Sequence, residues 1–397
     1  MLFIPPLDKM TCIEDLRQVA ERRVPRMFYD YCDSGSWTET TYRSNETEYT
    51  PIKFRQRVAI NMENRTTATK MIGQDVAMPV ALAPVGSCGM QHADGEILAA
   101  QAAEKFGVPF TLSTMSVCSI EDVAEKVSKP FWFQLYVMRE REFMYGLIDR
   151  AKAAGCSALV VTLDLQVLGQ RHKDIKNGLS TPPKPTISNL INLATKPWWC
   201  LDMLKTPRRT FRNIVGHAKS VSDLSSLSVW TAEQFDPALN WELIDRIRDH
   251  WGGKLILKGI MEPEDAELAV AHGADAIVVS NHGGRQLDGA PATIDVLPRI
   301  VDTVGDKVEV WVDSGIRSGQ DVLKAWALGA KGTLIGRSYI YGLGAYAKPG
   351  VTKALEIIHN ELDTTMAFCG HTNINNVTQD ILLPGTYPLP DKFTNKD

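Results

Sequence analysis

KLILKGIMEPEDAELAVAHGADAIVVSNHG, residues 254–283, contains two short apolar runs separated by one amphipathic stretch. The runs KLILKGI and AIVVSNHG are almost continuously apolar, as expected of strands that are buried on both faces of a parallel sheet. The stretch between them begins with acidic residues and ends in Gly-Ala, a helix C-terminal signal that leads directly into the next strand. This segment therefore predicts one strand–helix–strand unit of an α/β protein.

The same alternation recurs along the chain. The eight best strand candidates are VALAPVG (80–86), FTLST (110–114), FWFQLY (131–136), ALVVTLD (158–164), KLILKGI (254–260), AIVVSNHG (276–283), VEVWVDSG (308–315) and GTLIGR (332–337). Helical stretches lie between most of them, for example at 95–107, 119–127, 141–155, 262–274 and 318–330. Eight such units favour a (β/α)8 TIM barrel. An open doubly wound sheet stays possible, because periodicity alone does not show closure.

Two segments lie outside this repeat, and we expect them to belong to a single domain that spans residues 1–397. Residues 1–79 form an N-terminal lead-in with helical character around Ile13–Val24, and residues 165–240 form a long loop insertion after the fourth strand. A connection of this length is usually a functional lid or a disordered segment. Part of it, ISNLINLATKPWWCLDML (187–204), is apolar and is followed by basic residues. Residues 183–215 therefore predict either a loop packed on its own barrel or a patch that docks on a membrane surface.

Composition excludes several classes of protein. The net charge of -4 and the lack of a long basic run argue against a nucleic-acid partner. The seven cysteines are scattered without a CxxC pair, so we expect neither a disulfide framework nor a metal site. The N-terminus lacks the pattern of a secretory signal, and no run of about 18 apolar residues occurs. These features predict a cytoplasmic protein without a spanning helix.

Polar and ionisable residues follow nearly every predicted strand. In a TIM barrel the C-terminal strand ends meet at one mouth, where the chemistry takes place. There Lys258, Arg285 and Arg171 would repel one another unless anionic ligands lay among them. At the last two strand ends, the glycines of DSGIR (313–317) and GTLIGR let backbone N–H groups approach an anion, and Arg317 and Arg337 add charge. We interpret this pair as a phosphate site rather than two tight turns. Because GxGxxG is missing, FMN fits better than a nicotinamide dinucleotide.

The run SNHGGRQLDGAPATIDVLP (280–298) resembles the signature of the FMN-dependent α-hydroxy acid dehydrogenases and oxidases. The resemblance continues in chain order through YDYCDSG (29–35), LAPVG, LSTMSVCSIEDV (112–123), FWFQLYV, VVTLDL, RHKDIKNG (171–178), LILKGI, VDSGIR and IGR. It covers most of the chain, and within the family it is strongest to the bacterial respiratory L-lactate dehydrogenases.

The resemblance implies that FMN lies across the strand ends. Lys258 would lie near N1 and the C2 carbonyl, where a preorganised ammonium stabilises the negative charge left by hydride arrival. The other residues implied to hold the cofactor are Pro84, Val85 and Gly86 against the N5 edge, Ser113, Gln134 and Thr162 on the ring, Ser280 facing the cofactor, and Asp313, Gly315, Arg317, Gly336 and Arg337 on the ribityl chain and phosphate.

The resemblance also implies an L-2-hydroxy acid substrate, with oxidation of L-lactate to pyruvate as the expected reaction. Arg171 and Arg285 would bind the carboxylate. His282 would be the base, with Asp164 stabilising the imidazolium. Tyr31 and Tyr136 would add phenolic hydrogen bonds, and Met115 would line the pocket. The residues leave open whether His282 takes the hydroxyl proton with hydride transfer to N5 or the α-proton to give a carbanion.

The electron acceptor and the assembly are less constrained. Gly86 stands where some oxygen-using members carry alanine, which favours a quinone or cytochrome of the respiratory chain. The family resemblance implies a homotetramer, peripheral on the inner face of the cytoplasmic membrane if residues 183–215 dock there. The alternatives are an O2-using oxidase of glycolate or of longer or aromatic 2-hydroxy acids, another phosphate-binding barrel enzyme, and a catalytically inactive barrel that serves as a binding module.

Overall fold

Eight parallel strands form one sheet in the computed structural model, which describes residues 4–179, 186–218 and 234–390. All eight predicted strands are confirmed: β3 (Val80–Leu82), β4 (Thr111–Ser113), β5 (Trp132–Tyr136), β6 (Ala158–Thr162), β7 (Lys254–Ile260), β8 (Ala276–Val279), β9 (Glu309–Val312) and β10 (Gly332–Ile335). The sheet order is β3-β10-β9-β8-β7-β6-β5-β4. A parallel bridge from Leu82 to Phe110 joins the two edge strands. The sheet therefore closes into the expected TIM barrel, and the open-sheet alternative is wrong.

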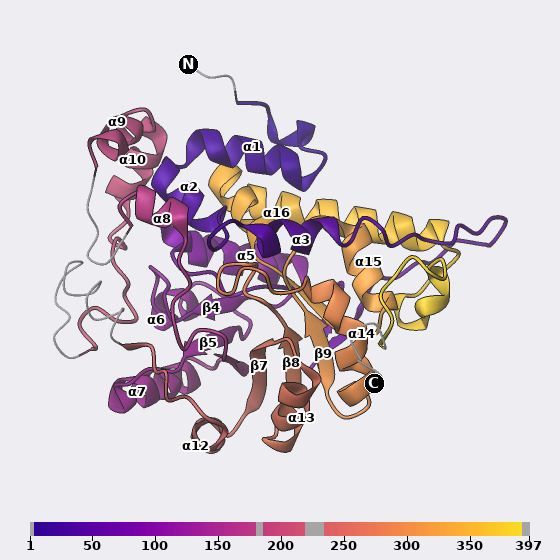
Figure 1. Cartoon of the computed structure of the whole chain (residues 1–397). Coiled ribbons are helices and arrows are strands. Elements are labelled where there is room, and N and C mark those ends of the chain that lie inside the picture. The colour runs from indigo at the N-terminus through magenta and orange to yellow at the C-terminus, as the bar shows by residue number, and fades with distance from the viewer. Residues whose placement is uncertain (1–3, 180–185, 219–233, 391–397) are drawn as a thin grey trace.

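One main helix follows each barrel strand and covers the outside of the barrel (Figure 1). These helices are α5 (Gly95–Phe106), α6 (Ile120–Ala124), α7 (Arg141–Ala153), α12 (Trp241–Trp251), α13 (Pro263–Ala271), α14 (Thr293–Val304), α15 (Gly319–Ala327) and α16 (Arg337–Phe368). A short helix, α4 (Cys88–Gln91), precedes α5. Side-chain caps start several of them; Ser318, for example, accepts a hydrogen bond from the backbone of Asp321 at the start of α15. The helices confirm the predicted alternation.

Large apolar side chains fill the inside of the barrel below the mouth. Trp132 and Trp311 stack there with ring centroids 5.2 Å apart. A two-stranded antiparallel hairpin, β1 (Thr69–Met71) and β2 (Gln74–Val76), places the fully buried Met71 in the same cluster. Burial of a methionine side chain contributes about 1.5–3 kcal/mol. The hairpin was not predicted, because its strands are only three residues long each.

The N-terminal lead-in packs along α16 and across the C-terminal end of the barrel (Figure 1). The predicted helix is confirmed as α1 (Ile13–Arg23), whereas η1 (Leu7–Lys9), α2 (Arg26–Cys32) and α3 (Thr40–Thr47) were not predicted. The carboxylate of Asp288, which follows β8, accepts hydrogen bonds from the backbone N–H groups of Thr38 and Thr41 at 3.0 and 2.9 Å. This contact holds the lead-in at the barrel mouth.

The excursion after β6 was predicted as a loop, but its described part contains three short helices: α8 (His172–Lys176), α9 (Ile187–Ala194) and α10 (Pro197–Lys205). Thr186 caps α9 by accepting from Asn189 N at 3.1 Å, and Pro197 lies in the first turn of α10. Residues 180–185 and 219–233 of the excursion lie outside the described residues.

The last described elements are α16, which is kinked at Tyr346 and Ala347, and the 3-10 helices η2 (Ile374–Asn376) and η3 (Gln379–Ile381). No helix in the described part of the chain has the length and apolar character needed to cross a membrane.

Candidate active site

His282 and Asp164 form a hydrogen-bonded pair at the barrel mouth. His282 Nδ1 lies 2.9 Å from Asp164 Oδ1, and the two side chains are only 20% and 14% exposed. Burial alone would raise the pKa of Asp164, but the charge and hydrogen bond of His282, together with Lys258, lower it below its ordinary value. In either form of the imidazole, an ionised Asp164 accepts from Nδ1–H, so that in the neutral form the lone pair lies on Nε2. The pair therefore presents a proton acceptor to the mouth.

The backbone after β8 turns sharply to present His282. Three consecutive residues have positive φ: His282 (58°), Gly283 (68°) and Gly284 (70°). Histidine is among the non-glycine residues that tolerate this region best. A Cβ on Gly284 would lie 2.4 Å from Tyr42 N, and one on Gly283 would lie 2.7 Å from an Arg337 guanidinium nitrogen. The two glycines therefore allow the His282 turn and the lead-in to occupy the same mouth.

A continuous row of buried polar side chains crosses the ends of β4, β5 and β6. Ser113 Oγ donates to Gln134 Oε1 at 3.1 Å, and Gln134 Nε2 donates to Thr162 Oγ1 at 3.0 Å. All three side chains come from strands that are neighbours in the sheet. One N–H of the Gln134 amide and the hydroxyl proton of Thr162 are left to donate to a ligand. The row thus offers a polar edge to a planar group at the mouth.

Lys258 on β7 continues this row. Its ammonium donates to Ser280 Oγ at 2.6 Å and lies 2.9 Å from Asp313 Oδ2. Burial lowers the pKa of this lysine, but Asp313 and Asp164 outweigh it, and the pKa is raised. Ser280 Oγ also accepts from His282 N at 3.1 Å, so the lysine and the histidine meet at one hydroxyl. An ammonium has three N–H donors, and these contacts use two, so one is available to a ligand.

Arg171 and Arg285 converge on the ring of Tyr31. Their guanidinium carbons lie 5.7 and 4.9 Å from the Tyr31 centroid. Burial lowers the pKa of Arg285, and the positive charge of Arg171 lowers it further. Arg171 has a partner in Asp174, whereas Arg285 donates to the backbone carbonyls of Tyr31 and Ser34. A carboxylate bound between the two guanidinium groups would relieve their repulsion.

The other residues predicted for the substrate lie nearby. Burial raises the pKa of Tyr136, and the neighbouring Tyr31 and Asp164 raise it further, which keeps the phenol protonated as a hydrogen-bond donor. A Cβ built on Gly86 would lie 3.3 Å from both Tyr31 Oη and Met115 Cβ. Gly86, predicted to face the cofactor, is therefore a neighbour of Tyr31 and Met115, which are predicted to face the substrate.

Residues Tyr31 to Ser34 connect the lead-in to the mouth. Their four consecutive carbonyl oxygens accept hydrogen bonds from Arg285, Arg337 and Lys173. The Asp33 carboxylate accepts from the hydroxyls of Tyr341, Tyr42 and Tyr29 at 2.6, 2.8 and 2.9 Å. Burial alone would raise the pKa of Asp33, but these hydroxyls and Arg337 lower it. An ionised carboxylate thus anchors the segment that carries Tyr31.

The residues predicted for the phosphate gather around the ends of β9 and β10. Arg317 Nη2 lies 2.6 Å from Glu46 Oε1, and Arg337 donates to Cys32 O, Ser34 O and Gly283 O. Asp313, predicted to hold the ribityl chain, pairs with Lys258. A Cβ on Gly336 would meet only Val85 and Ala83 within 4 Å, both at ordinary contact distance. Gly336 at the end of β10 therefore lies beside Val85, which follows β3. Arg337 is the next residue in the chain.

The residues of this mouth fit FMN. Lys258, Gln134 and Thr162 keep free donors for ring carbonyls and nitrogens, and the glycine-containing ends of β9 and β10 lie where such barrels hold a phosphate. Pro84 and Val85 are partly exposed beside Gly336. Residues 4–179, 186–218 and 234–390 contain no cluster of metal-ligating side chains. The arrangement is that of a flavin-dependent oxidoreductase.

Comparison with known proteins agrees with this geometry. A family model described as FMN-dependent dehydrogenase matches residues 20–384. Proteins named L-lactate dehydrogenase are 44% identical in Actinobacillus pleuropneumoniae serotype 5b and 42% identical in Haemophilus influenzae, each match covering 93% of this chain and 97% of the relative. The chain belongs to the FMN-dependent dehydrogenase family, and FMN is its cofactor.

The fold is also similar to solved structures of proteins named mandelate dehydrogenase and mandelate oxidase. The crystal structure of the monotopic membrane protein (S)-mandelate dehydrogenase matches with a TM-score of 0.90 at 34% identity, over 94% of this chain and 99% of the other. A soluble mutant of the membrane-associated (S)-mandelate dehydrogenase from Pseudomonas putida matches with a TM-score of 0.80 at 33% identity, over 94% and 99%. A mandelate oxidase with (S)-2-phenylpropionate matches with a TM-score of 0.79 at 34% identity, over 94% and 98%.

Sequence reasoning missed several residues that shape this site. Asp33 and Tyr42 anchor the lead-in, and Gln286 donates to the carbonyls of Asp164 and Val167 at 2.9 and 2.8 Å. The motifs YDYCDSG and SNHGGRQLDG contain Asp33 and Gln286, so a signal was present for both. Their specific contacts depend on how the two loops meet in space, which the motifs do not encode.

Proposed function

We propose that this protein oxidises L-lactate to pyruvate with FMN and passes the electrons to a quinone or cytochrome of the respiratory chain. The observation that carries the proposal is the His282–Asp164 pair, which leaves Nε2 as a base at a mouth where Tyr136 interacts electrostatically with Asp164 and with both arginines. Relatives named L-lactate dehydrogenase at 42–44% identity support lactate as the substrate. FMN, when bound, supplies the acceptor for the two electrons that leave C2 of the substrate.

The protein residues position the substrate and remove its proton. Arg171 and Arg285 bind the carboxylate, and the phenols of Tyr31 and Tyr136 donate to the polar oxygens of the substrate. His282 Nε2 accepts the departing proton, and Asp164 stabilises the imidazolium through Nδ1. The ammonium of Lys258 provides fixed positive charge at the ring edge. The substrate loses two electrons and two protons in total, which gives the 2-keto acid.

The histidine assignment is tested by His282→Ala, measured as anaerobic flavin reduction by L-lactate. We expect the variant to retain FMN and to lose reduction rate by about 10³-fold or more, because general-base catalysis alone is worth about 10²–10⁴-fold. His250→Ala is the matched control, because His250 forms a similar 2.8 Å contact with Asp149 on the outer surface. Near-normal reduction in His282→Ala would refute the base assignment.

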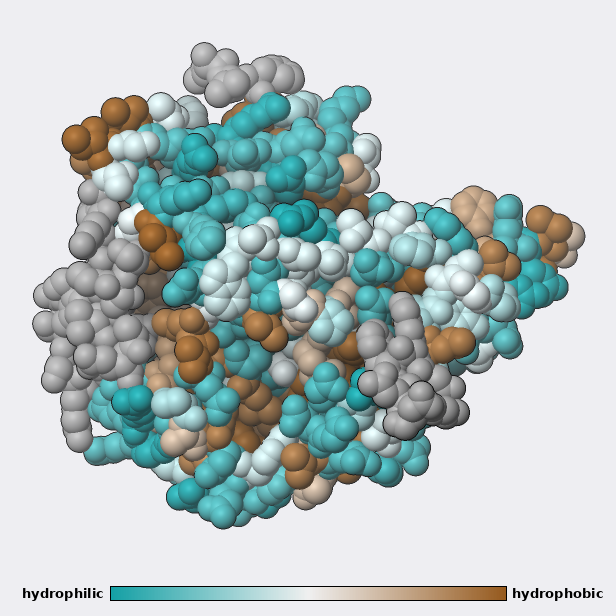
Figure 2. All heavy atoms as spheres, in the orientation of Figure 1, coloured by the Kyte–Doolittle hydropathy of each residue, from teal (hydrophilic) through white to brown (hydrophobic). Residues whose placement is uncertain are grey.

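The outer face of α9 and α10 supports docking on a membrane. Ile187, Leu190, Ile191, Trp198 and Leu204 are 59–78% exposed, and Figure 2 shows apolar surface over this helix pair. The inner face is packed: Trp199 stacks on Phe28 at 5.4 Å and donates to Met90 O at 2.9 Å. An amphipathic pair that is anchored on one side and apolar on the other suits the lipid interface. The cytoplasmic protein would then be peripheral on the inner face of the membrane.

Vesicle binding tests this localisation. The double variant Leu190→Asp, Ile191→Asp should release the protein from anionic phospholipid vesicles while flavin reduction by L-lactate stays unchanged. Leu268→Asp is the control, because Leu268 is a 40% exposed leucine on α13. Equal vesicle partition of the double variant and the control would contradict membrane docking and favour the packed-loop interpretation.

A panel of 2-hydroxy acids and acceptors tests the remaining part of the proposal. The alternative is an oxidase that uses O2 on another 2-hydroxy acid, and the similarity to mandelate enzymes makes (S)-mandelate the first competing substrate to measure.

We propose that residues 1–397 form one FMN-binding domain, since the lead-in contributes Tyr31 to the mouth, and that the protein assembles as a homotetramer. Light scattering of the holoenzyme tests the assembly.

A further inference from the structure

Glu96 is a buried carboxylate that the proposed reaction does not use. It lies in the first turn of α5 and is 1% exposed. Its Oε1 accepts from the backbone N–H groups of Gly89 and Val117 at 3.0 and 2.8 Å, and its Oε2 lies 3.3 Å from Cys118 N. Within the described ranges, no lysine, arginine or histidine lies within ion-pairing distance of it. Three backbone N–H groups are therefore hydrogen-bonded to this buried carboxylate.

These three donors come from two segments that border the active site. Gly89 follows Pro84–Gly86, the segment predicted to face the cofactor, and Val117 and Cys118 follow Met115, predicted to line the substrate pocket. The segments also meet directly, since Ser87 N donates to Met115 O at 2.9 Å. A Cβ on Gly89 would lie 2.6 Å from Val117 Cβ. Because the packing is this close, a shift of one segment moves the other.

A carboxylate is needed for this contact. Both of its oxygens accept hydrogen bonds, whereas an amide offers one acceptor and directs an N–H₂ at the third backbone N–H. Two donors facing each other in a buried site would force one segment to move. Glu96 thus fixes the spacing between the loops after β3 and β4 through its two acceptor oxygens as well as by its shape.

We propose that Glu96 is a positioning residue that sets the distance between Gly86 and Met115 and thereby the size of side chain accepted on C2 of the substrate. The inference rests on the proposed function. The mouth places Met115 and Tyr31 against Gly86, so a change in loop spacing alters the volume beside the substrate carbon.

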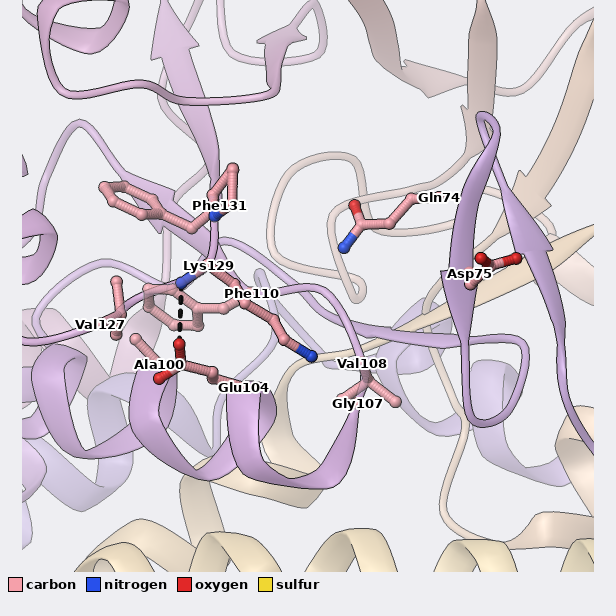
Figure 3. A pocket seen from close by; sticks show the side chains of 11 residues that line it. Gln74, Asp75, Ala100, Glu104, Gly107, Val108, Phe110, Val127, Lys129 and Phe131 are labelled. Atoms are coloured by element: carbon pink, nitrogen blue, oxygen red, sulfur yellow. Dashed lines mark hydrogen bonds between the residues drawn. The ribbon is translucent and has the colours of Figure 1, made fainter.

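The same helix provides a matched control in Glu104. Glu104 Oε1 also accepts three hydrogen bonds, from Ser128 N, Ser128 Oγ and Lys129 N. Figure 3 shows it beside a small pocket with Gln74 of β2 and Phe131, which precedes β5. This pocket lies at the N-terminal end of the barrel, opposite the mouth. Loss of Glu104 removes three contacts to a loop without touching the site.

The test compares Glu96→Gln with Glu104→Ala as purified holoenzymes. The measurements are FMN content, the visible flavin spectrum, the thermal midpoint, and kcat/KM for L-lactate and for (S)-mandelate with a soluble dye. We expect Glu96→Gln to shift the ratio of the two kcat/KM values and the flavin spectrum, with a loss on lactate of up to about 10²-fold, the cost of a misplacement of about 1 Å. Glu104→Ala should lower the thermal midpoint and keep the wild-type ratio and spectrum.

Two results separate the inference from the proposed function. If wild-type flavin is not reduced by any 2-hydroxy acid, the proposed function fails. If the wild type is reduced but Glu96→Gln keeps its substrate ratio and spectrum, the positioning role is overturned. Should Glu96→Gln not fold, Glu96→Asp, which keeps the charge and withdraws it by one methylene group, is judged by the same criteria.

Discussion

Replacement of Asp164 by asparagine isolates the electrostatic part of the His282 pair. Asparagine is nearly isosteric and its carbonyl oxygen still accepts from Nδ1–H, so the histidine keeps its orientation. The substitution removes the negative charge of the carboxylate, whose Oδ1 lies 2.9 Å from His282 Nδ1 in the wild type. Because that charge stabilises a protonated imidazole far more than a neutral one, Asp164→Asn should slow the proton-accepting step and leave substrate binding nearly unchanged.

The size of the effect follows from Coulomb's law. Opposite unit charges about 4 Å apart attract by about 4 kcal/mol at an effective dielectric constant of about 20. A loss of this size from the transition state corresponds to about 10³-fold in rate. Since the proton is only partly transferred in the transition state, we expect a fall of about 10²–10³-fold.

Stopped-flow reduction of the flavin by L-lactate without oxygen measures this step directly. Asp149→Asn is the matched control, because Asp149 contacts His250 at 2.8 Å with both side chains on the surface. FMN content and circular dichroism should match the wild type in both variants. A decrease of less than about tenfold in Asp164→Asn with FMN retained would refute the role of Asp164 in stabilising an imidazolium.

Three further changes test the surroundings of the pair. Lys258→Met leaves the buried Asp313 without its cation, so it should destabilise the protein by about 3–5 kcal/mol and weaken FMN binding, measured by thermal denaturation and flavin release. Gly284→Ala places a Cβ 2.4 Å from Tyr42 N at a residue with φ of 70°, and should lower both the thermal midpoint and the lactate affinity. The pKa of Asp164 is lower in the folded protein than its ordinary 3.8. The contribution of ionised Asp164 to stability is therefore fully present above pH 3.8 and is lost as the pH falls through the pKa of Asp164 in the folded protein. The free energies of unfolding of wild type and Asp164→Asn, measured in urea, should therefore differ less below this folded-state pKa than above pH 3.8.

The barrel itself could be predicted from sequence because its signal is local. Each strand, such as Ala158–Thr162, is a run of buried residues, and each following helix has its own apolar face. The hairpin at Thr69–Val76 was missed because three-residue strands carry little periodicity, and its stability comes from Met71 packing under the barrel. The helices of the excursion were missed because an exposed apolar segment gives the same composition in a loop and in a short helix.

The candidate site could be predicted only at the level of single residues. His282, Asp164 and Lys258 were assigned from strand ends and motif resemblance, and the structure brings them together. The anchoring of Tyr31 by Asp33 could not be predicted, because it depends on Tyr341, whose hydroxyl approaches from 308 residues further along the chain. Contacts of this kind arise from tertiary packing and have no local periodicity.

The four carbonyl groups of Tyr31 to Ser34 have a consequence for biosynthesis. Arg285 and Arg337, which bind three of them, follow 251 to 305 residues later, whereas Lys173, which binds the carbonyl of Asp33, follows 140 residues later. A nascent chain emerging from the ribosome therefore carries residues 31–34 long before most of their partners exist. The contacts of residues 31–34 with Arg285 and Arg337 can therefore form only after most of the chain has been synthesised. The predicted FMN site, which includes Arg337 from the start of α16, is accordingly complete only after most of the chain has been synthesised.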